Sequence, residues 1–266
     1  MGRIDDVFRK KGGTAFIGFA VAGDPDRDTS VNIARALIAG GTDILELGVP
    51  FSDPVADGPT IQKADERALA AGTTPDTIFS IVKEIREGSP VPIVLLTYYN
   101  TVYQRGIDRF YREARDAGVD GILIADMPVE ESDDVTKTAA HYGIAPIFLI
   151  SQTTTDKRID RIMSRAGGYL YLVSVLGVTG ARETVSPDAL DLLHRVRNHT
   201  SLPLALGFGI STPEQVKTCV QAGADGVIVG SAIVDIVEKY LHDQQAMTAE
   251  LTSYIYGMKS AANRSP

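Results

Sequence analysis

The chain has 266 residues, which is more than the usual single-domain size of about 100 to 150 residues but within the range of one α/β barrel. Hydrophobic residues make up 44% and charged residues 23%, a composition that excludes a disordered chain and favours a globular core. The formal net charge of −8 at pH 7 has the wrong sign for non-specific binding to nucleic acid or to an anionic membrane.

A single cysteine, Cys219, excludes an intramolecular disulfide and any cysteine-based structural zinc site. Residues 1–11 carry charges throughout and contain no apolar run of signal-peptide length. Nowhere do about 18 uncharged apolar residues follow one another, as a membrane-spanning helix would need. These features favour a reducing compartment, and we expect a cytoplasmic protein.

Short apolar runs alternate with longer segments of helical period along the whole chain, which is the pattern of βα units around a parallel sheet. The predicted strands are residues 14–20, 44–47, 92–97, 121–124, 145–150, 169–173, 204–207 and 226–229. The predicted helices are residues 4–10, 29–39, 59–71 with a second piece to 86, 107–117, 132–142, 155–164, 187–199, 213–222 and a last region from 232 toward 261.

A weak internal repeat supports this alternation. An Ala-Gly pair followed by a short apolar run begins at Ala39, Ala117 and Ala222, with a looser copy at Ala166. Glycine just past a helix accepts the left-handed conformation that ends it, and the apolar run is the next buried strand. We therefore expect one (β/α)₈ TIM barrel over residues 1–266, with an extra N-terminal helix closing its bottom and a flexible tail at 263–266.

An open doubly wound sheet would show the same alternation of strands and helices. Eight strands in regular order, with no GxGxxG motif after the first, favour the barrel. In a barrel the reactive groups lie at the carboxyl ends of the strands. Functional residues are therefore expected at these strand ends.

Glu46 is the most unusual strand-end residue. Because side chains alternate along a strand, Leu45 and Leu47 are expected to face the helices and Glu46 the barrel interior. Burial disfavours the charged form of a carboxyl group and raises its pKa toward the range useful for proton transfer. The alternative is a structural carboxylate, hydrogen-bonded within the core.

The loop after this strand carries a second candidate, Asp57. It precedes Gly58 and Pro59 close to a helix start, so a plain turn or cap is an equally good interpretation of its chemistry alone. A glutamate on a strand and an aspartate on the adjoining loop can, however, act as acid and base on opposite sides of one substrate.

Glycines cluster at three consecutive strand ends late in the chain, at residues 177–180, 207–209 and 230–231. In barrels this corner often binds a phosphate group through backbone N–H groups and a helix N-terminus, here expected to begin near Ser231. Glycine also serves ordinary turns, but three such segments together favour phosphate binding.

Histidines and lysines avoid the predicted strand ends. His141, His194, His199 and His242 all fall in helices or at helix ends, which disfavours a histidine-ligated catalytic metal. A Schiff-base lysine is disfavoured in the same way. Acid–base chemistry by carboxyl groups on a phosphorylated substrate remains.

The residues from Leu45 to Gln62, LELGVPFSDPVADGPTIQ, resemble the signature of the tryptophan synthase α-subunit family. The resemblance extends over nearly the whole chain, through the segments at 126–131, 177–180, 207–210 and 230–233. It implies a carbon–carbon lyase that cleaves indole-3-glycerol phosphate into indole and glyceraldehyde 3-phosphate by a retro-aldol reaction. It also implies an α₂β₂ assembly in which indole passes to a β subunit for tryptophan biosynthesis. Pyridoxal phosphate is then expected in that β subunit, with no cofactor and no metal in this chain.

The resemblance also implies a role for individual residues. Glu46 would be the acid and base at indole C3, and Asp57 would accept the indole N–H and stabilise its growing positive charge. Tyr171 would place its hydroxyl by Glu46, and Thr179 would hold Asp57 when the sixth loop closes. The indole would lie among Phe19, Leu96 and Tyr98, and the phosphate at Gly180, Phe208, Gly209, Gly230 and Ser231.

Two other functions stay open at this stage. Another phosphate-binding barrel enzyme of amino-acid biosynthesis would want its acid and base on the first and fifth strands, where Ala20 and Ile150 stand. A non-catalytic subunit that binds a phosphorylated ligand to regulate a partner would not need Glu46 and Asp57. Candidate contacts with a β subunit are Asp53-Pro54 and the segment 177–180.

Overall fold

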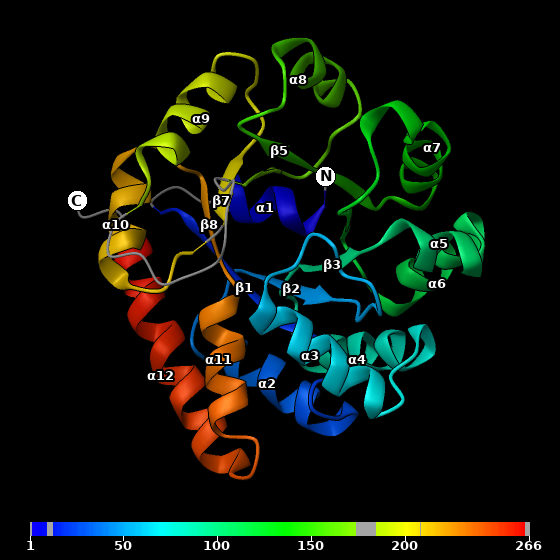
Figure 1. The fold of residues 1–266 in the computed structure, drawn as a ribbon, viewed down its shortest axis with the longest axis vertical. Coiled ribbons are helices and arrows are strands. Elements are labelled where there is room, and N and C mark those ends of the chain that lie inside the picture. The colour runs from blue at the N-terminus through cyan, green and yellow to red at the C-terminus, as the bar shows by residue number, and fades with distance from the viewer. Residues whose placement is uncertain (1, 10–12, 174–184, 208, 264–266) are drawn as a thin grey trace.

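Eight parallel strands pair in the order of the sequence, and β8 pairs back to β1, so that the sheet closes into a barrel (Figure 1). The computed structural model describes residues 2–9, 13–173, 185–207 and 209–263. The strands are β1 (Ala15–Val21), β2 (Ile44–Gly48), β3 (Ile93–Thr97), β4 (Gly121–Ile124), β5 (Ala145–Ser151), β6 (Leu170–Val173), β7 (Leu204–Gly207) and β8 (Gly226–Val229). Every predicted strand is present within one residue at each end, and the predicted barrel is confirmed.

Helices surround the barrel in Figure 1. They are α1 (Arg3–Arg9), α2 (Arg27–Ala39), α3 (Pro59–Ala70), α4 (Pro75–Gly88), α5 (Tyr99–Arg105), α6 (Ile107–Ala117), α7 (Asp133–Tyr142), α8 (Asp156–Met163), α9 (Pro187–Arg197), α10 (Pro213–Gln221), α11 (Ser231–Lys239) and α12 (Gln244–Ala262), with a short 3₁₀ helix, η1 (Val129–Glu131). None of the helices in the described ranges is long and apolar enough to cross a membrane.

Apart from shifts of one or two residues at helix ends and the unpredicted η1, the predicted helices differ from the structure in two places. The seven-residue helix α5 follows β3 directly and was not predicted, because it is too short to show a clear helical period. The last helical region is two helices rather than one. The Asp243 carboxylate accepts the Ala246 N–H (3.0 Å) and so starts α12 as a separate helix.

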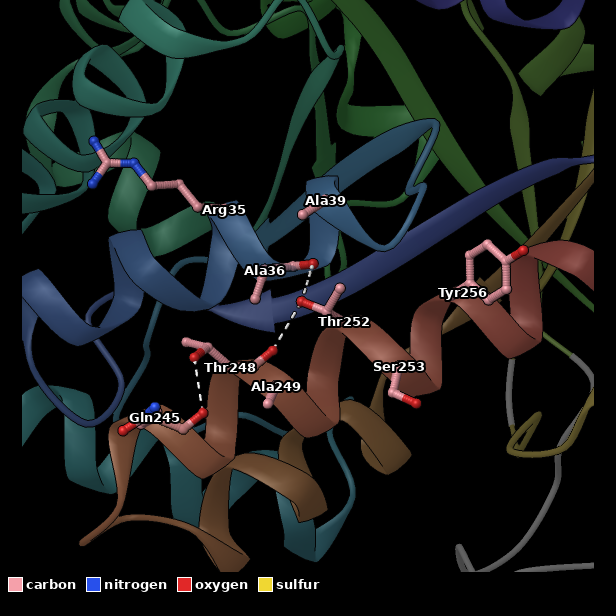
Figure 2. A pocket seen from close by; sticks show the side chains of 9 residues that line it. All are labelled: Arg35, Ala36, Ala39, Gln245, Thr248, Ala249, Thr252, Ser253 and Tyr256. Atoms are coloured by element: carbon pink, nitrogen blue, oxygen red, sulfur yellow. Dashed lines mark hydrogen bonds between the residues drawn. The ribbon is translucent and has the colours of Figure 1, made fainter.

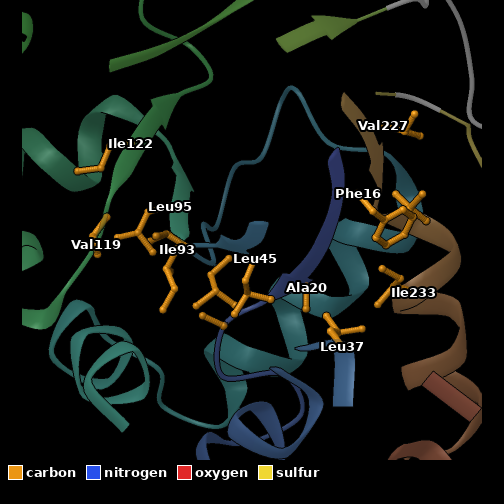
Figure 3. Packing of buried hydrophobic residues seen from close by; sticks show 14 of the residues in the cluster. Phe16, Ala20, Leu37, Leu45, Ile93, Leu95, Val119, Ile122, Val227 and Ile233 are labelled. Atoms are coloured by element: carbon orange, nitrogen blue, oxygen red, sulfur yellow. The ribbon is translucent and has the colours of Figure 1, made fainter. Parts of the chain in front are cut away.

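The core has two layers, separated by the strands. The outer layer lies between strands and helices, and Figure 3 shows part of it, with Leu45 and Leu95 on neighbouring strands and Leu37 on α2. The inner layer fills the barrel and includes Ile44, and Ile4 of α1 closes it at one end. The predicted alternation along β2 and the predicted N-terminal plug are therefore confirmed.

The Ala-Gly repeat includes an aspartate that joins neighbouring strands at their amino ends. Asp43, Asp120 and Asp225 each donate a backbone N–H to the preceding odd-numbered strand and accept an N–H from the same residue of that strand. For Asp120 the two bonds to Ile93 are 2.8 and 2.9 Å long. A cation pairs with each carboxylate: Lys259, Arg86 and Arg197, respectively. A glycine of the repeat has the predicted left-handed conformation at the end of the helix, for example Gly118 (φ +98°), the C-cap of α6.

Candidate active site

Inward-facing residues near the carboxyl ends of the strands form the candidate site. Phe19 on β1 lies opposite Glu46 on β2 in the strand register, and Gly48 of β2 lies opposite Leu96 on β3. Leu96 is half-buried and packs against both the inner layer and the Phe19 cluster. The structure thus brings Glu46 and two of the residues predicted to bind indole to neighbouring strands.

Glu46 is fully buried, with 0% of its surface exposed. The Tyr169 hydroxyl donates to Oε2 at 3.2 Å, whereas Oε1 has no hydrogen-bond partner in the described part of the chain. Burial raises the pKa of Glu46 to about 8, the charge of Asp57 adds to the rise, and the bond from Tyr169 opposes it. Glu46 therefore holds a proton at neutral pH and has one oxygen free to act on a ligand.

A tyrosine other than the predicted one donates the hydrogen bond to Glu46. Tyr171 was predicted to lie by Glu46, but the hydrogen bond comes from Tyr169, two residues earlier on the same face of the chain. Side-chain alternation gives both tyrosines the same inward direction and cannot say how deep each one lies. Tyr171 remains in the neighbourhood, because the charges of Glu46 and Asp57 both act on it, and burial raises its pKa well above the usual range.

Asp57 lies in the loop between β2 and α3. The Tyr98 hydroxyl donates to its Oδ2 at 2.7 Å and accepts the Ala56 N–H at 3.0 Å. Burial raises the pKa of Asp57, and the hydrogen bond from Tyr98 opposes that rise. The N-cap of α3 is Gly58, with no side-chain cap bond. The interpretation of Asp57 as a helix cap is therefore wrong, and its carboxyl group faces the Tyr98 hydroxyl instead.

Tyr98 has a structural role in the site that was not predicted from the sequence. It is buried, and its ring stacks on Phe51 with 4.8 Å between centroids and 17° between planes. The Tyr98 side chain thus contacts the loop twice, through its hydroxyl at Ala56 and Asp57 and through its ring at Phe51. The prediction that Tyr98 contacts indole stays a prediction.

Glycines at the strand ends make room for the Phe19 ring. A Cβ on Gly48 would lie 2.8 Å from Phe19 Cζ, and one on Gly230 would lie 3.3 Å from Phe19 Cδ1. A larger residue at Gly48 would force the Phe19 ring to move. A larger residue at Gly230 would make a tight contact with the same ring, which would have to shift by a few tenths of an ångström. Gly48 was not among the predicted site residues, although a glycine at an inward position of a strand is a signal for close approach by a neighbouring group.

The predicted phosphate corner is described in part. α11 begins at Ser231, as predicted, and its N-cap is Gly230, which has no side-chain cap bond. Gly209 has φ +71°, a conformation that favours glycine. The first N–H groups of a helix have no partner within the helix and carry the positive end of its dipole, so the start of α11 suits an anion. Thr179, Gly180 and Phe208 lie outside the described residues, as does the rest of the segment 177–180.

Asp65 was not singled out from the sequence, although a signal for it exists. Ile61, Ala64, Asp65 and Ala68 have the spacing of one helix face, and all four are buried on α3. A carboxyl residue within an apolar stripe of this kind marks an unusual environment. Burial, followed by the charges of Asp57 and Asp24, raises the pKa of Asp65 to about 8.

A groove on the outside of the barrel carries none of this chemistry. It lies between α2 and α12, where Thr252 Oγ1 donates to the Ala36 carbonyl (Figure 2). No carboxyl group is among the residues that line it. Within the described ranges, no group of three or more His, Cys, Asp or Glu side chains could hold a metal ion.

The fold and the site together define a (β/α)₈-barrel protein with two carboxyl groups of raised pKa at the carboxyl ends of its strands. The family model of the tryptophan synthase alpha chain matches residues 6–263. The chain therefore belongs to the tryptophan synthase alpha chain family.

Relatives and solved structures agree with this assignment. The tryptophan synthase alpha chain of Methanoregula boonei is 72% identical, over 99% of this chain and all of the relative. A solved structure described as the tryptophan synthase α₂β₂ complex of Pyrococcus furiosus is 41% identical, with a TM-score of 0.87 over 93% of this chain and 98% of that one. The alpha subunit of Legionella pneumophila is 34% identical, with a TM-score of 0.90 over 98% of both chains.

Proposed function

We propose that the chain cleaves indole-3-glycerol phosphate into indole and glyceraldehyde 3-phosphate, with Glu46 as the acid. The observation that carries this proposal is a fully buried carboxyl group that keeps its proton at neutral pH and leaves one oxygen without a partner among the described residues. Such a group can deliver a proton to carbon in a site from which water is excluded.

Every proton and electron pair of the cleavage is accounted for by the substrate and Glu46. Protonation of indole C3 by Glu46 gives an indolenine whose nitrogen is positively charged. The bond between C3 and the glycerol carbon then breaks, and its electron pair returns to the indole ring and neutralises the nitrogen. The hydroxyl on the glycerol carbon loses its proton to the Glu46 carboxylate and becomes the aldehyde, so that Glu46 ends the cycle protonated.

Asp57 supplies the countercharge for the indolenine nitrogen. Its position supports this role, because the Tyr98 hydroxyl donates to one oxygen and favours the ionised form. An anion held in a site of low polarity stabilises a cation that forms only in the transition state. Tyr171 and Thr179 support the pair, and Phe19, Leu96 and Tyr98 line the indole.

The phosphate group of the substrate binds at Gly180, Phe208, Gly209, Gly230 and Ser231. Support comes from α11, which begins at Ser231 with the positive end of its dipole and with no side-chain cap on Gly230. No cofactor or metal takes part in these steps.

A β subunit that carries pyridoxal phosphate receives the indole in an α₂β₂ assembly. The similar structure from Pyrococcus furiosus is described as an α₂β₂ complex, which supports this assembly. Asp53-Pro54 and the segment 177–180 are the contacts, and Val55, next to Pro54 in the chain, is 85% exposed. The chain acts as one domain over residues 1–266, with a tail at 263–266, and works in the cytoplasm.

Neither alternative function finds support in the site. Ala20 and Ile150 pack in the outer layer, and the neighbouring inward residues Phe19 and Leu149 carry no acid or base. A purely regulatory subunit would not need a protonated, unpartnered Glu46.

The decisive experiment measures indole release from indole-3-glycerol phosphate by the purified chain, with and without a β subunit. We expect release in both cases and a faster rate in the complex. Binding of the substrate without any indole release, even in the complex, would contradict the proposal and favour a regulatory role.

A further inference from the structure

Asp65 is a carboxyl group placed among apolar side chains. It lies on α3 with 4% of its surface exposed, on the same helix face as Ala64 and Ala68. That face packs against Phe19 and Val21 at the carboxyl end of β1. Only a small part of Asp65 is therefore open to water.

No cation or hydrogen-bond donor compensates Asp65 in the described part of the chain. Arg67, on the same helix, is committed to Asp24 through two bonds of 2.7 and 2.9 Å. Lys63 pairs instead with Glu238 of α11 at 3.3 Å. An ionised carboxylate with neither a donor nor a cation is costly in apolar surroundings, so a group of this kind keeps its proton.

The neighbouring charges act in the same direction. Asp57 and Asp24 both disfavour a further negative charge on Asp65, and Asp65 in turn disfavours ionisation of the Tyr98 hydroxyl. Asp57 has a donor in Tyr98, whereas Asp65 has none among the described residues. Of the two interacting carboxyl groups, Asp57 is therefore the one that loses its proton first.

We propose that Asp65 stays protonated at neutral pH and is a positioning residue for Asp57, so that a single negative charge faces the indole nitrogen. This inference rests on the proposed function of Asp57. When Asp65 ionises, its carboxylate and that of Asp57 repel each other. Asp57 is the one that moves, because it lies on a loop and is held there by Tyr98, whereas Asp65 lies on a helix. Displacement of Asp57 weakens its contact with the indole N–H and so raises KM.

The first test detects the proton directly by infrared spectroscopy, without any measurement of cleavage. A protonated carboxyl group has a C=O stretching band that a carboxylate lacks. At pH 7 we expect Asp65→Asn to lose one such band relative to wild type, and Glu66→Gln to lose none. Glu66 is the matched control, because it is exposed on the same helix and its substitution makes the same change from a carboxyl group to an amide.

A second variant makes this test independent of the folding of Asp65→Asn. Glu46→Gln removes the other carboxyl group expected to be protonated, so its spectrum should keep one band at pH 7 and lose that band as the pH rises past about 8. The absence of any such band in Glu46→Gln, or an unchanged spectrum in Asp65→Asn, would overturn the proposal.

The second test separates KM from kcat across pH 7 to 9. Ionisation of Glu46 removes the acid and lowers kcat in every variant that retains Glu46. In wild type we expect KM to rise by about three- to tenfold as well, since a coupling of one pKa unit corresponds to tenfold. In Asp65→Asn the rise in KM should be absent, while Glu66→Gln should match wild type.

The two tests separate this inference from the proposed reaction. A wild-type rise in KM that persists unchanged in Asp65→Asn would show that Asp65 does not position Asp57. A band lost in Asp65→Asn, together with a wild-type chain that never releases indole, would confirm the proton on Asp65. It would reject the proposed cleavage and, with it, the positioning role.

Discussion

The Tyr169 hydroxyl and the Glu46 carboxyl group meet across the barrel, from the amino side of β6 to the middle of β2, with 3.2 Å between the two oxygens. The bond occupies only Oε2, and Oε1 has no partner in the described part of the chain. Tyr169 thus fixes the direction of the carboxyl group while leaving one oxygen for a ligand.

Replacement of Glu46 by Gln should abolish measurable indole release, because the amide has no acidic proton to give to C3. Loss of a general acid costs about 10² to 10⁴ in rate. The folded state should survive, since the amide has nearly the same shape and is neutral, as the buried acid is. Wild-type turnover by purified Glu46→Gln would sink the assignment.

Replacement of Tyr169 by Phe should move the alkaline limit of activity to higher pH. The Tyr169 bond lowers the pKa of Glu46, so its removal raises that pKa above about 8. Glu46 must be protonated to act, and activity is lost as the pH passes its pKa. The pH dependence of kcat checks this, with Tyr111→Phe, a buried tyrosine of the outer layer, as the control. An alkaline limit that stays in place or falls would contradict the role given to Tyr169.

Replacement of Asp57 by Asn should reduce kcat by about 10² to 10³, which is the usual cost of losing one electrostatic stabiliser of a transition state. Tyr98→Phe should have a smaller effect of about tenfold or more, because a hydrogen bond to a charged group contributes about 1.5 to 3 kcal/mol. Steady-state kinetics of both single variants and of the double variant measure this. If the two effects simply multiply in the double variant, Tyr98 does not act through Asp57.

Replacement of Gly209 or Gly230 by Val should raise KM sharply while the chain stays folded. At Gly230 the side chain would meet Phe19 and block the approach of an anion to the N-terminus of α11. Gly257→Val is the control, because a Cβ there meets nothing within 4 Å. A liganded crystal structure with the phosphate elsewhere in the barrel would refute this site.

Addition of a β subunit should increase indole release by the purified chain. The loop that carries Asp57 also carries the exposed Val55, so docking at this surface can order the acid–base groups. Such coupling is reciprocal. If a ligand of the alpha chain changes the affinity of the β site, a ligand of the β site should change the affinity of the alpha chain by the same factor. The measurement is indole formation against added β subunit, and a flat titration despite demonstrated binding would contradict the ordering of the loop.

Periodicity in the sequence was sufficient to predict the strands. A buried parallel strand is a short apolar run, and it comes directly after a helix that ends at a glycine. It also predicted the inward direction of Glu46, since direction depends only on alternation. It could not predict that Tyr169 rather than Tyr171 bonds to Glu46, because that contact depends on depth along opposite strands. Tyr98 was missed as the partner of Asp57 for a related reason, since the loop conformation alone brings them together.

Asp43, Asp120 and Asp225 tie neighbouring strands together at the end of the barrel opposite Glu46 and Asp57. Rigidity is thus built in where no substrate binds, and the reactive groups occupy the other end of the same strands. Selection can therefore alter the mouth of the barrel, one loop at a time, without loosening the framework that keeps the strands in register. A chain built in this way can change its substrate and still keep its fold.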